Sequence, residues 1–130
     1  MNTKALMICS ALFLITVGLG LTFIPQEIAK YLEFNQSQAI FLTLQIQGSL
    51  YLGFGILNWM TKNNLIGGIY SRPLVIGNLM HFMVSSIALI KVVGKFNSSE
   101  SSIFLVVSIV YFVFALLFGY VFITNPKQVK

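Results

Sequence analysis

The sequence predicts an all-α protein, a bundle of four antiparallel helices that each span a membrane. Two properties of the whole chain support this fold class: 57% of its 130 residues are hydrophobic and only 8% are charged. Soluble domains carry about 25% charged residues, so the composition disfavours a water-soluble protein. The third observation is four long apolar runs, each close to the roughly 20 residues that a helix needs to cross a bilayer. We therefore expect residues 1–130 to form a single integral membrane domain.

The first apolar run covers about residues 5–24 and is followed by Pro25. One lysine ahead of an apolar core is also typical of a signal peptide, but no small-x-small cleavage site follows. We therefore expect a retained helix. The next stretch, "PQEIAKYLEFNQSQ", predicts a short amphipathic segment that lies on the membrane surface.

The other three runs cover about residues 38–60, 73–93 and 102–123. Ser37 stands where its side chain can cap the first turn of the second span. Pro73 is tolerated in the first turn of the third span, because its missing N–H would have no helical partner there. The run "SSESS" before the fourth span offers several capping side chains.

The charges outside the spans predict an orientation. Four spans place both termini and the loop of residues 61–72 on one side, with five basic residues, and leave three basic residues and all three glutamates on the other. Since cytoplasmic loops are enriched in Lys and Arg, we expect both termini in the cytoplasm, in a bacterial inner membrane. The basic residues stand singly and form no stripe, so we expect no nucleic-acid partner. The two sets are Lys4, Lys62, Arg72, Lys127 and Lys130, and Lys30, Lys91 and Lys95.

Small residues in the second span predict where helices meet. Ser49 and Gly53 are four residues apart, and Gly48 and Gly55 are seven apart on a neighbouring stripe. Helices in lipid gain little hydrophobic free energy by pairing, so small residues mark the contacts at which backbones approach closely. We interpret these four positions as a helix-packing face, and Gly18, Gly77 and Gly119 as its candidate counterparts in the other spans.

Polar residues in the spans predict a second feature. Asn78, His81 and Ser85 follow one another at spacings of three and four, which places them on one helical face. His81 is the only ionisable side chain near mid-membrane, and such groups are functional candidates. The alternative is a neutral histidine that holds two helices together by hydrogen bonding to Asn or Ser.

The second span supplies groups at matching depths. Asn58 lies near the level of Asn78 and His81, and Gln45 lies nearer the opposite end of its span. Each group would be unsatisfied in hydrocarbon, so we predict one polar seam between the second and third spans. We expect Trp59 and Arg72 to anchor the inner ends of these spans at the membrane interface.

The same residues argue against catalysis. One histidine with the distant Cys9 and the methionines supplies too few ligands for a metal site. No carboxylate lies within a span to act as an acid–base partner of His81. We therefore expect no enzyme and no cofactor, with a lipid or quinone headgroup as the ligand class that the seam could accept.

Three stretches carry a resemblance to a known group: "GLTFIP", "GSLYLGFGILNWM" and "RPLVIGNLMHF". Across about residues 19–90 the chain resembles the small four-helix membrane proteins grouped with the DoxX-like families. The resemblance implies a role that depends on a partner, because some relatives are membrane subunits of oxidoreductases that deliver electrons to quinone.

The sequence thus favours an accessory or structural subunit of a larger membrane complex, in contact with lipid and with other subunits or copies of itself. Two alternatives stay open. The first is a small transporter or channel that works as an oligomer, although no Asp or Glu is embedded to couple an ion. The second is a membrane enzyme that uses His81 as an acid–base group.

Overall fold

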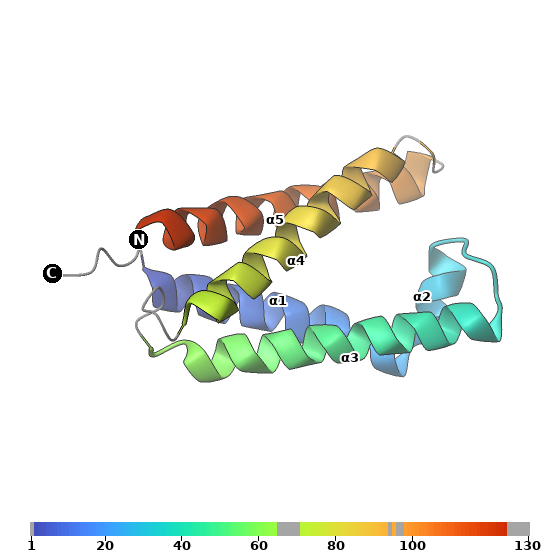
Figure 1. Ribbon diagram of the computed structural model, residues 1–130. Coiled ribbons are helices and arrows are strands. Elements are labelled where there is room, and N and C mark those ends of the chain that lie inside the picture. Colours follow the sequence, from blue (N-terminus) through green and yellow to red (C-terminus); the bar gives the residue numbers. More distant parts are fainter. Residues whose placement is uncertain (1, 65–70, 94, 96–97, 125–130) are drawn as a thin grey trace, which may run out of the picture. The chain divides into compact units, whose positions relative to one another are not determined.

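The computed structural model describes residues 2–64, 71–93, 95 and 98–124, without the side chains of residues 98–101. All regular structure in these ranges is helical, which confirms the predicted all-α class (Figure 1). Four of the helices contain segments long and apolar enough to cross a membrane, within a few residues of the predicted spans. In chain order the helices are α1 (Thr3–Phe23), α2 (Pro25–Tyr31), α3 (Gln38–Thr61), α4 (Arg72–Val93) and α5 (Ser98–Thr124).

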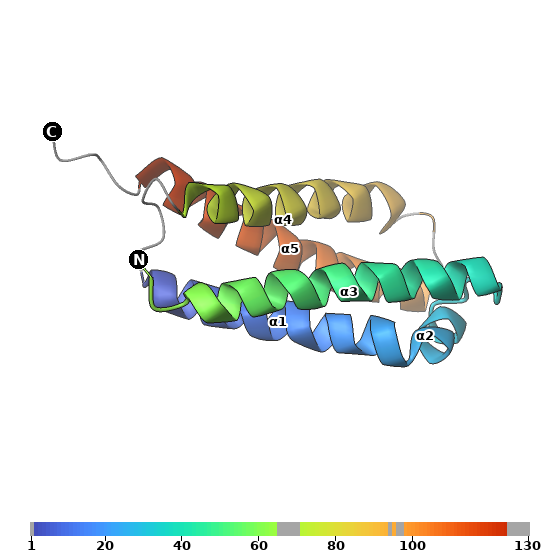
Figure 2. The same cartoon turned by 60° about the horizontal axis from the view of Figure 1, so that its bottom comes forward.

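The chain divides into two compact units, Met1–Asn64 and Leu65–Lys130. In the first unit α1 and α3 run antiparallel and side by side, with α2 between them in the chain (Figures 1 and 2). The second unit is the antiparallel pair of α4 and α5. The single domain predicted from the sequence stays a prediction.

Side-chain caps fix the starts of α1 and α3. The Asn2 side chain accepts a hydrogen bond from the Ala5 N–H at 3.2 Å. Ser37 Oγ accepts one from the Ile40 N–H at 3.3 Å, which confirms the predicted cap. Each oxygen satisfies an N–H of the first turn that has no partner within its helix.

The start of α5 differs from the prediction. The helix begins at Ser98, so "SSESS" lies within α5 and does not precede it as a cap. The apolar run marks the part of a helix that fits the bilayer, whereas a backbone can stay helical beyond it on polar residues. The apolar segment itself, Ser102–Thr124, agrees with the predicted fourth span.

The predicted surface segment forms α2. Pro25 occupies the first turn, and Pro25 and Ala29 are buried while Glu27 and Lys30 are exposed. Proline suits this position because its fixed φ fits the helix and no N–H is needed there. The seven-residue helix therefore buries one side and keeps its charges on the other.

A Schellman motif ends α2. The Phe34 N–H donates to the Ala29 carbonyl at 2.8 Å, and the Glu33 N–H donates to the Lys30 carbonyl at 3.2 Å. This pattern requires a left-handed residue at the position of Glu33, whose φ is 53°. Glycine is the usual residue there, since a Cβ atom disfavours the left-handed conformation.

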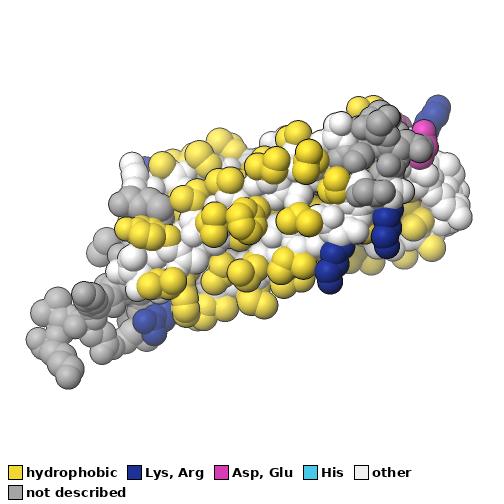
Figure 3. All heavy atoms as spheres, turned by 90° about the horizontal axis from the view of Figure 1, so that it is seen from above, with side chains coloured by type: hydrophobic (Ala, Val, Ile, Leu, Met, Phe, Trp, Pro, Cys, Tyr) yellow, Lys and Arg dark blue, Asp and Glu magenta, His cyan; other side chains and the backbone are white. Residues whose placement is uncertain are grey.

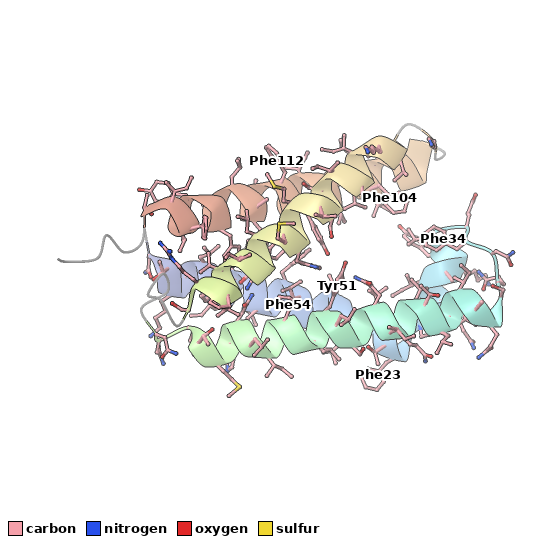
Figure 4. The ribbon with its side chains drawn as sticks, in the orientation of Figure 1. Phe23, Phe34, Tyr51, Phe54, Phe104 and Phe112 are labelled. Carbon is pink, nitrogen blue, oxygen red and sulfur yellow. The ribbon has the colours of Figure 1, made fainter. Side chains whose placement is uncertain are left out.

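The spans turn apolar side chains outward. Hydrophobic side chains cover much of the face shown in Figure 3, and charged ones lie toward its ends. Phe23 and Phe112, which are 74% and 49% exposed, point away from their helices in Figure 4. A surface of this kind is suited to hydrocarbon or to apolar faces of other proteins.

Candidate functional site

The backbones of α1 and α3 meet at two glycines. A Cβ atom at Gly18 would lie 2.9 Å from the Gly48 carbonyl oxygen, and a Cβ atom at Gly48 would lie 2.9 Å from the Gly18 carbonyl oxygen. Real Cβ atoms do not approach other atoms so closely, so neither position accepts a larger residue without movement of the helices. Contacts this close also allow weak Cα–H···O hydrogen bonds between the two backbones.

The stripe of α3 that contains Gly48 and Gly55 packs along α1. A Cβ atom at Gly48 would also meet the hydroxyl of Thr22 and lie 2.8 Å from its amide nitrogen. A Cβ atom at Gly55 would lie 2.6 Å from Ile15 Cγ1 and 3.2 Å from the Ala11 carbonyl oxygen. Gly48 and Gly55 are therefore close-packing positions against α1.

Ser49 and Gly53 do not belong to this contact, which corrects their interpretation as packing residues of the same face. A Cβ atom at Gly53 would meet no atom within 4 Å in the described part of the chain, and Ser49 is exposed. The Ser49 hydroxyl donates to the Ile46 carbonyl of its own helix at 2.7 Å. At 100° per residue, both positions rotate away from the stripe of Gly48 and Gly55.

A buried polar pair lies further along the α1–α3 contact. Asn58 Nδ2 donates to Ser10 Oγ at 3.0 Å, and Ser10 Oγ donates to the Met7 carbonyl at 3.1 Å. Both Asn58 and Ser10 have no exposed surface. Asn58 thus has a partner on α1, in the first span, which the sequence interpretation missed. The available signal was that Ser10, Leu14 and Gly18 recur every four residues.

Gln45 also contacts the first span. Its side-chain Nε2 lies 3.5 Å from the Thr22 carbonyl oxygen, at the outer limit of a hydrogen bond. Gln45 itself is exposed. The described contacts of both polar residues predicted on α3, Asn58 and Gln45, thus include α1.

Aromatic rings fill the contact between α4 and α5. The Phe82 ring packs against those of Tyr111, Phe114 and Phe118, with centroid distances of 5.3, 4.8 and 5.7 Å. His81 joins this set at its edge, 5.1 Å from Phe82 and 5.6 Å from Tyr111. We call these five residues the aromatic cluster. Tyr111 is 2% exposed, so it is a core residue and no interfacial anchor.

The buried positions of α4 define the face that its partner covers. They are Val75, Asn78, Phe82 and Ser86, at spacings of three and four. His81 and Ser85 each precede a buried position and are only half-buried. The predicted trio is therefore divided: Asn78 lies in the buried row, and His81 and Ser85 lie on its flank.

The buried polar groups of this unit bond to nearby backbone. Asn78 Nδ2 donates to the Leu74 carbonyl at 3.0 Å, and Ser86 Oγ donates to the Met83 carbonyl at 2.8 Å. Ser108 Oγ of α5 reaches the Ser86 carbonyl at 3.4 Å and links the two helices. The sequence interpretation had not paired Ser86 with Ser108.

Cations lie beside rings at the ends of α3 and α4. Lys62 Nζ lies 3.3 Å from the centroid of the Trp59 ring, and Trp59 is 43% exposed. Arg72 Cζ lies 6.0 Å from the centroid of the Phe122 ring, near the limit of such an interaction. A half-exposed indole beside a lysine at a helix end is compatible with the predicted interfacial anchor.

The predicted seam would join Asn58 in the first unit to Asn78 and His81 in the second, and it stays a prediction. Among the described residues no group of three or more His, Cys, Asp or Glu side chains could hold a metal ion. The contacts described within each unit give two features, a buried amide–hydroxyl pair in the first and an aromatic cluster that carries a histidine in the second.

The chain was compared with known proteins at the level of sequence and of structure. No family model, curated protein or solved structure matches it. The resemblance to DoxX-like proteins therefore stays a prediction, and the four apolar helices identify the chain as a multi-pass helical membrane protein.

Proposed function

We propose that this protein is an accessory or structural subunit of a larger membrane complex. The observation that carries the proposal is the distribution of polarity in the spans. Buried polar groups such as Asn58 and Ser10 pair between helices, whereas large apolar side chains point outward along every span. Examples of the outward set are Leu12, Ile46, Leu50, Val84, Ile87, Leu105, Val106 and Leu116.

Close packing supports a scaffold role. The α1–α3 contact uses bare backbone at Gly18 and Gly48, and this geometry stabilises helix association without a catalytic group. The outward apolar faces are available to lipid and to the helices of other subunits or of further copies. The bacterial inner membrane and cytoplasmic termini belong to the same proposal and rest on the charge distribution. Two of its residues, Lys127 and Lys130, lie outside the described residues.

A ligand is the second candidate role, and one observation favours it. His81 lies at the edge of the aromatic cluster, beside Phe82 and Tyr111, rather than in the fully buried row. A planar, hydrogen-bonding headgroup of a quinone or a lipid has the chemistry to stack on rings and bond to an imidazole. A transporter or an enzyme that uses His81 has no comparable support among the described contacts.

The test is gentle extraction of the tagged chain from its native membrane, followed by native mass spectrometry. The proposal expects a stoichiometric foreign protein to travel with the chain. A bare chain or homo-oligomer at every detergent concentration tested would contradict the accessory role. A retained lipid or quinone in that bare form would support the ligand role instead.

A further inference from the structure

The glycine contact by itself does not define the register of the α1–α3 pair, which is the position of α3 along the axis of α1. Gly48 faces Gly18, and Gly55 lies on the same stripe seven residues later. Seven residues make two turns with a net rotation of only about 20°, and they advance the helix by about 10 Å. If α3 slid by that length, Gly55 would take the place of Gly48 opposite Gly18.

The apolar side chains offer little resistance to such a slide. Lipid tails are as apolar as leucine, so an apolar side chain gains nearly the same free energy from lipid as from a neighbouring helix. A polar side chain differs, because it needs a particular partner at a particular level. The α1–α3 pair has such a group in Asn58, which is fully buried and donates to Ser10.

We infer that the Asn58–Ser10 hydrogen bond selects one of two glycine-matched registers of the α1–α3 pair. A slide by two turns keeps a glycine opposite Gly18 but carries Asn58 about 10 Å away from Ser10. A single buried asparagine specifies register in coiled coils in the same way, at some cost in stability. Asn58 is thus a positioning residue, and it decides which α1 residues face Gly55.

The register is measured on the full chain by the distance between two nitroxide labels. Cys9→Ser removes the native thiol, and Leu19→Cys with Met60→Cys places one label on each helix. Both sites are exposed, at 45% and 72%, so neither label enters the helix contact. The labels are offset along the pair, so a slide changes their distance. Dilution with unlabelled protein removes distances between copies.

Four forms of the labelled protein are compared by double electron–electron resonance. The parent is expected to give one distance, and Ser10→Ala and Asn58→Leu a second, shorter one, reduced by up to about 10 Å. Ser86→Ala is the matched control: this serine of α4 is buried like Ser10, and its hydroxyl donates to the Met83 carbonyl of its own helix. It is expected to keep the parent distance.

Ser10→Ala decides the outcome, because it removes this acceptor of the Asn58 amide with almost no change in volume. The test therefore remains valid even if Asn58→Leu fails to fold. A single unshifted distance in Ser10→Ala overturns the inference. A second distance in Ser86→Ala also overturns it, because the register would then respond to the loss of any buried hydroxyl.

Discussion

At the scale of single residues, two glycines and one amide distinguish the α1–α3 contact. Gly18 and Gly48 bring two backbones together, and Asn58 adds one directed bond to Ser10. In the other unit the α4–α5 contact is made by rings, with His81 at their edge. The two pairs therefore respond differently to substitution: the first to added volume and the second to lost aromatic contact.

Gly48→Ala is expected to destabilise the protein by about 1–3 kcal/mol, because its methyl group would overlap Thr22 and the Gly18 carbonyl. Gly53→Ala is the matched control on the same helix, where a methyl group meets no described atom within 4 Å. Unfolding in mixed micelles titrated with a denaturing detergent gives both free energies. Equal losses at the two glycines would show that the α1–α3 contact does not distinguish them.

His81→Phe is expected to keep the ring contacts with Phe82 and Tyr111, whereas His81→Leu loses about 0.5–1.5 kcal/mol of aromatic interaction. The free energy of unfolding measures this difference. If a lipid or quinone travels with the parent, its loss from His81→Phe at unchanged stability assigns the imidazole to the ligand. Full retention of that molecule in His81→Phe would leave the histidine a structural role only.

At the scale of elements, the end of α2 places one residue in a strained conformation. Its Schellman motif places Glu33 in the left-handed region, at φ 53°, a conformation that costs a residue with a Cβ atom about 1–2 kcal/mol. The two backbone hydrogen bonds of Phe34 and Glu33 hold it there. The starts of α1 and α3 are capped by the side chains of Asn2 and Ser37.

Glu33→Gly is therefore expected to stabilise the protein by about 1 kcal/mol. Glu27→Gly is the matched control, because Glu27 is an exposed residue in the first turn of the same helix. There glycine is expected to destabilise by up to about 1 kcal/mol, through helix propensity and the lost charge at the helix start. Unfolding midpoints that move in the same direction for both variants would contradict the cap assignment.

At the scale of the whole molecule, the four apolar segments indicate a multi-pass membrane protein, and the charges outside them predict its orientation. The segment that contains α2 and the end of α3 at Lys62 lie on opposite sides of the membrane in a four-span topology. The predicted orientation rests only on the distribution of Lys and Arg, through the positive-inside rule.

Lys30→Cys is expected to react with a membrane-impermeant maleimide in intact spheroplasts, and Lys62→Cys only after permeabilisation. Both variants are made in a Cys9→Ser background, so that the native thiol does not contribute. Gel-shift labelling measures the reaction. The reverse pattern would place the termini outside the cytoplasm.

The sequence by itself determined the class, the spans and the cap at Ser37, because hydrophobic length and capping chemistry are local properties of the chain. The sequence also identified Gly48, Gly55 and Asn58 as residues that have no role on a helix surface in contact with lipid alone. The tertiary structure decided their partners. Spacing along one helix states which residues share a face but not which helix covers it, so the spacing within α3 could not by itself pair Asn58 with Ser10.

The same limit explains the other corrections. Ser49 and Gly53 match a small-residue spacing as well as Gly48 and Gly55 do, and only the position of α1 separates them. On α4, a rotation of one residue distinguishes Ser85 from Ser86, and the position of α5 buries the second. Periodicity determines the faces of these helices, whereas packing between neighbours decides which face is inside.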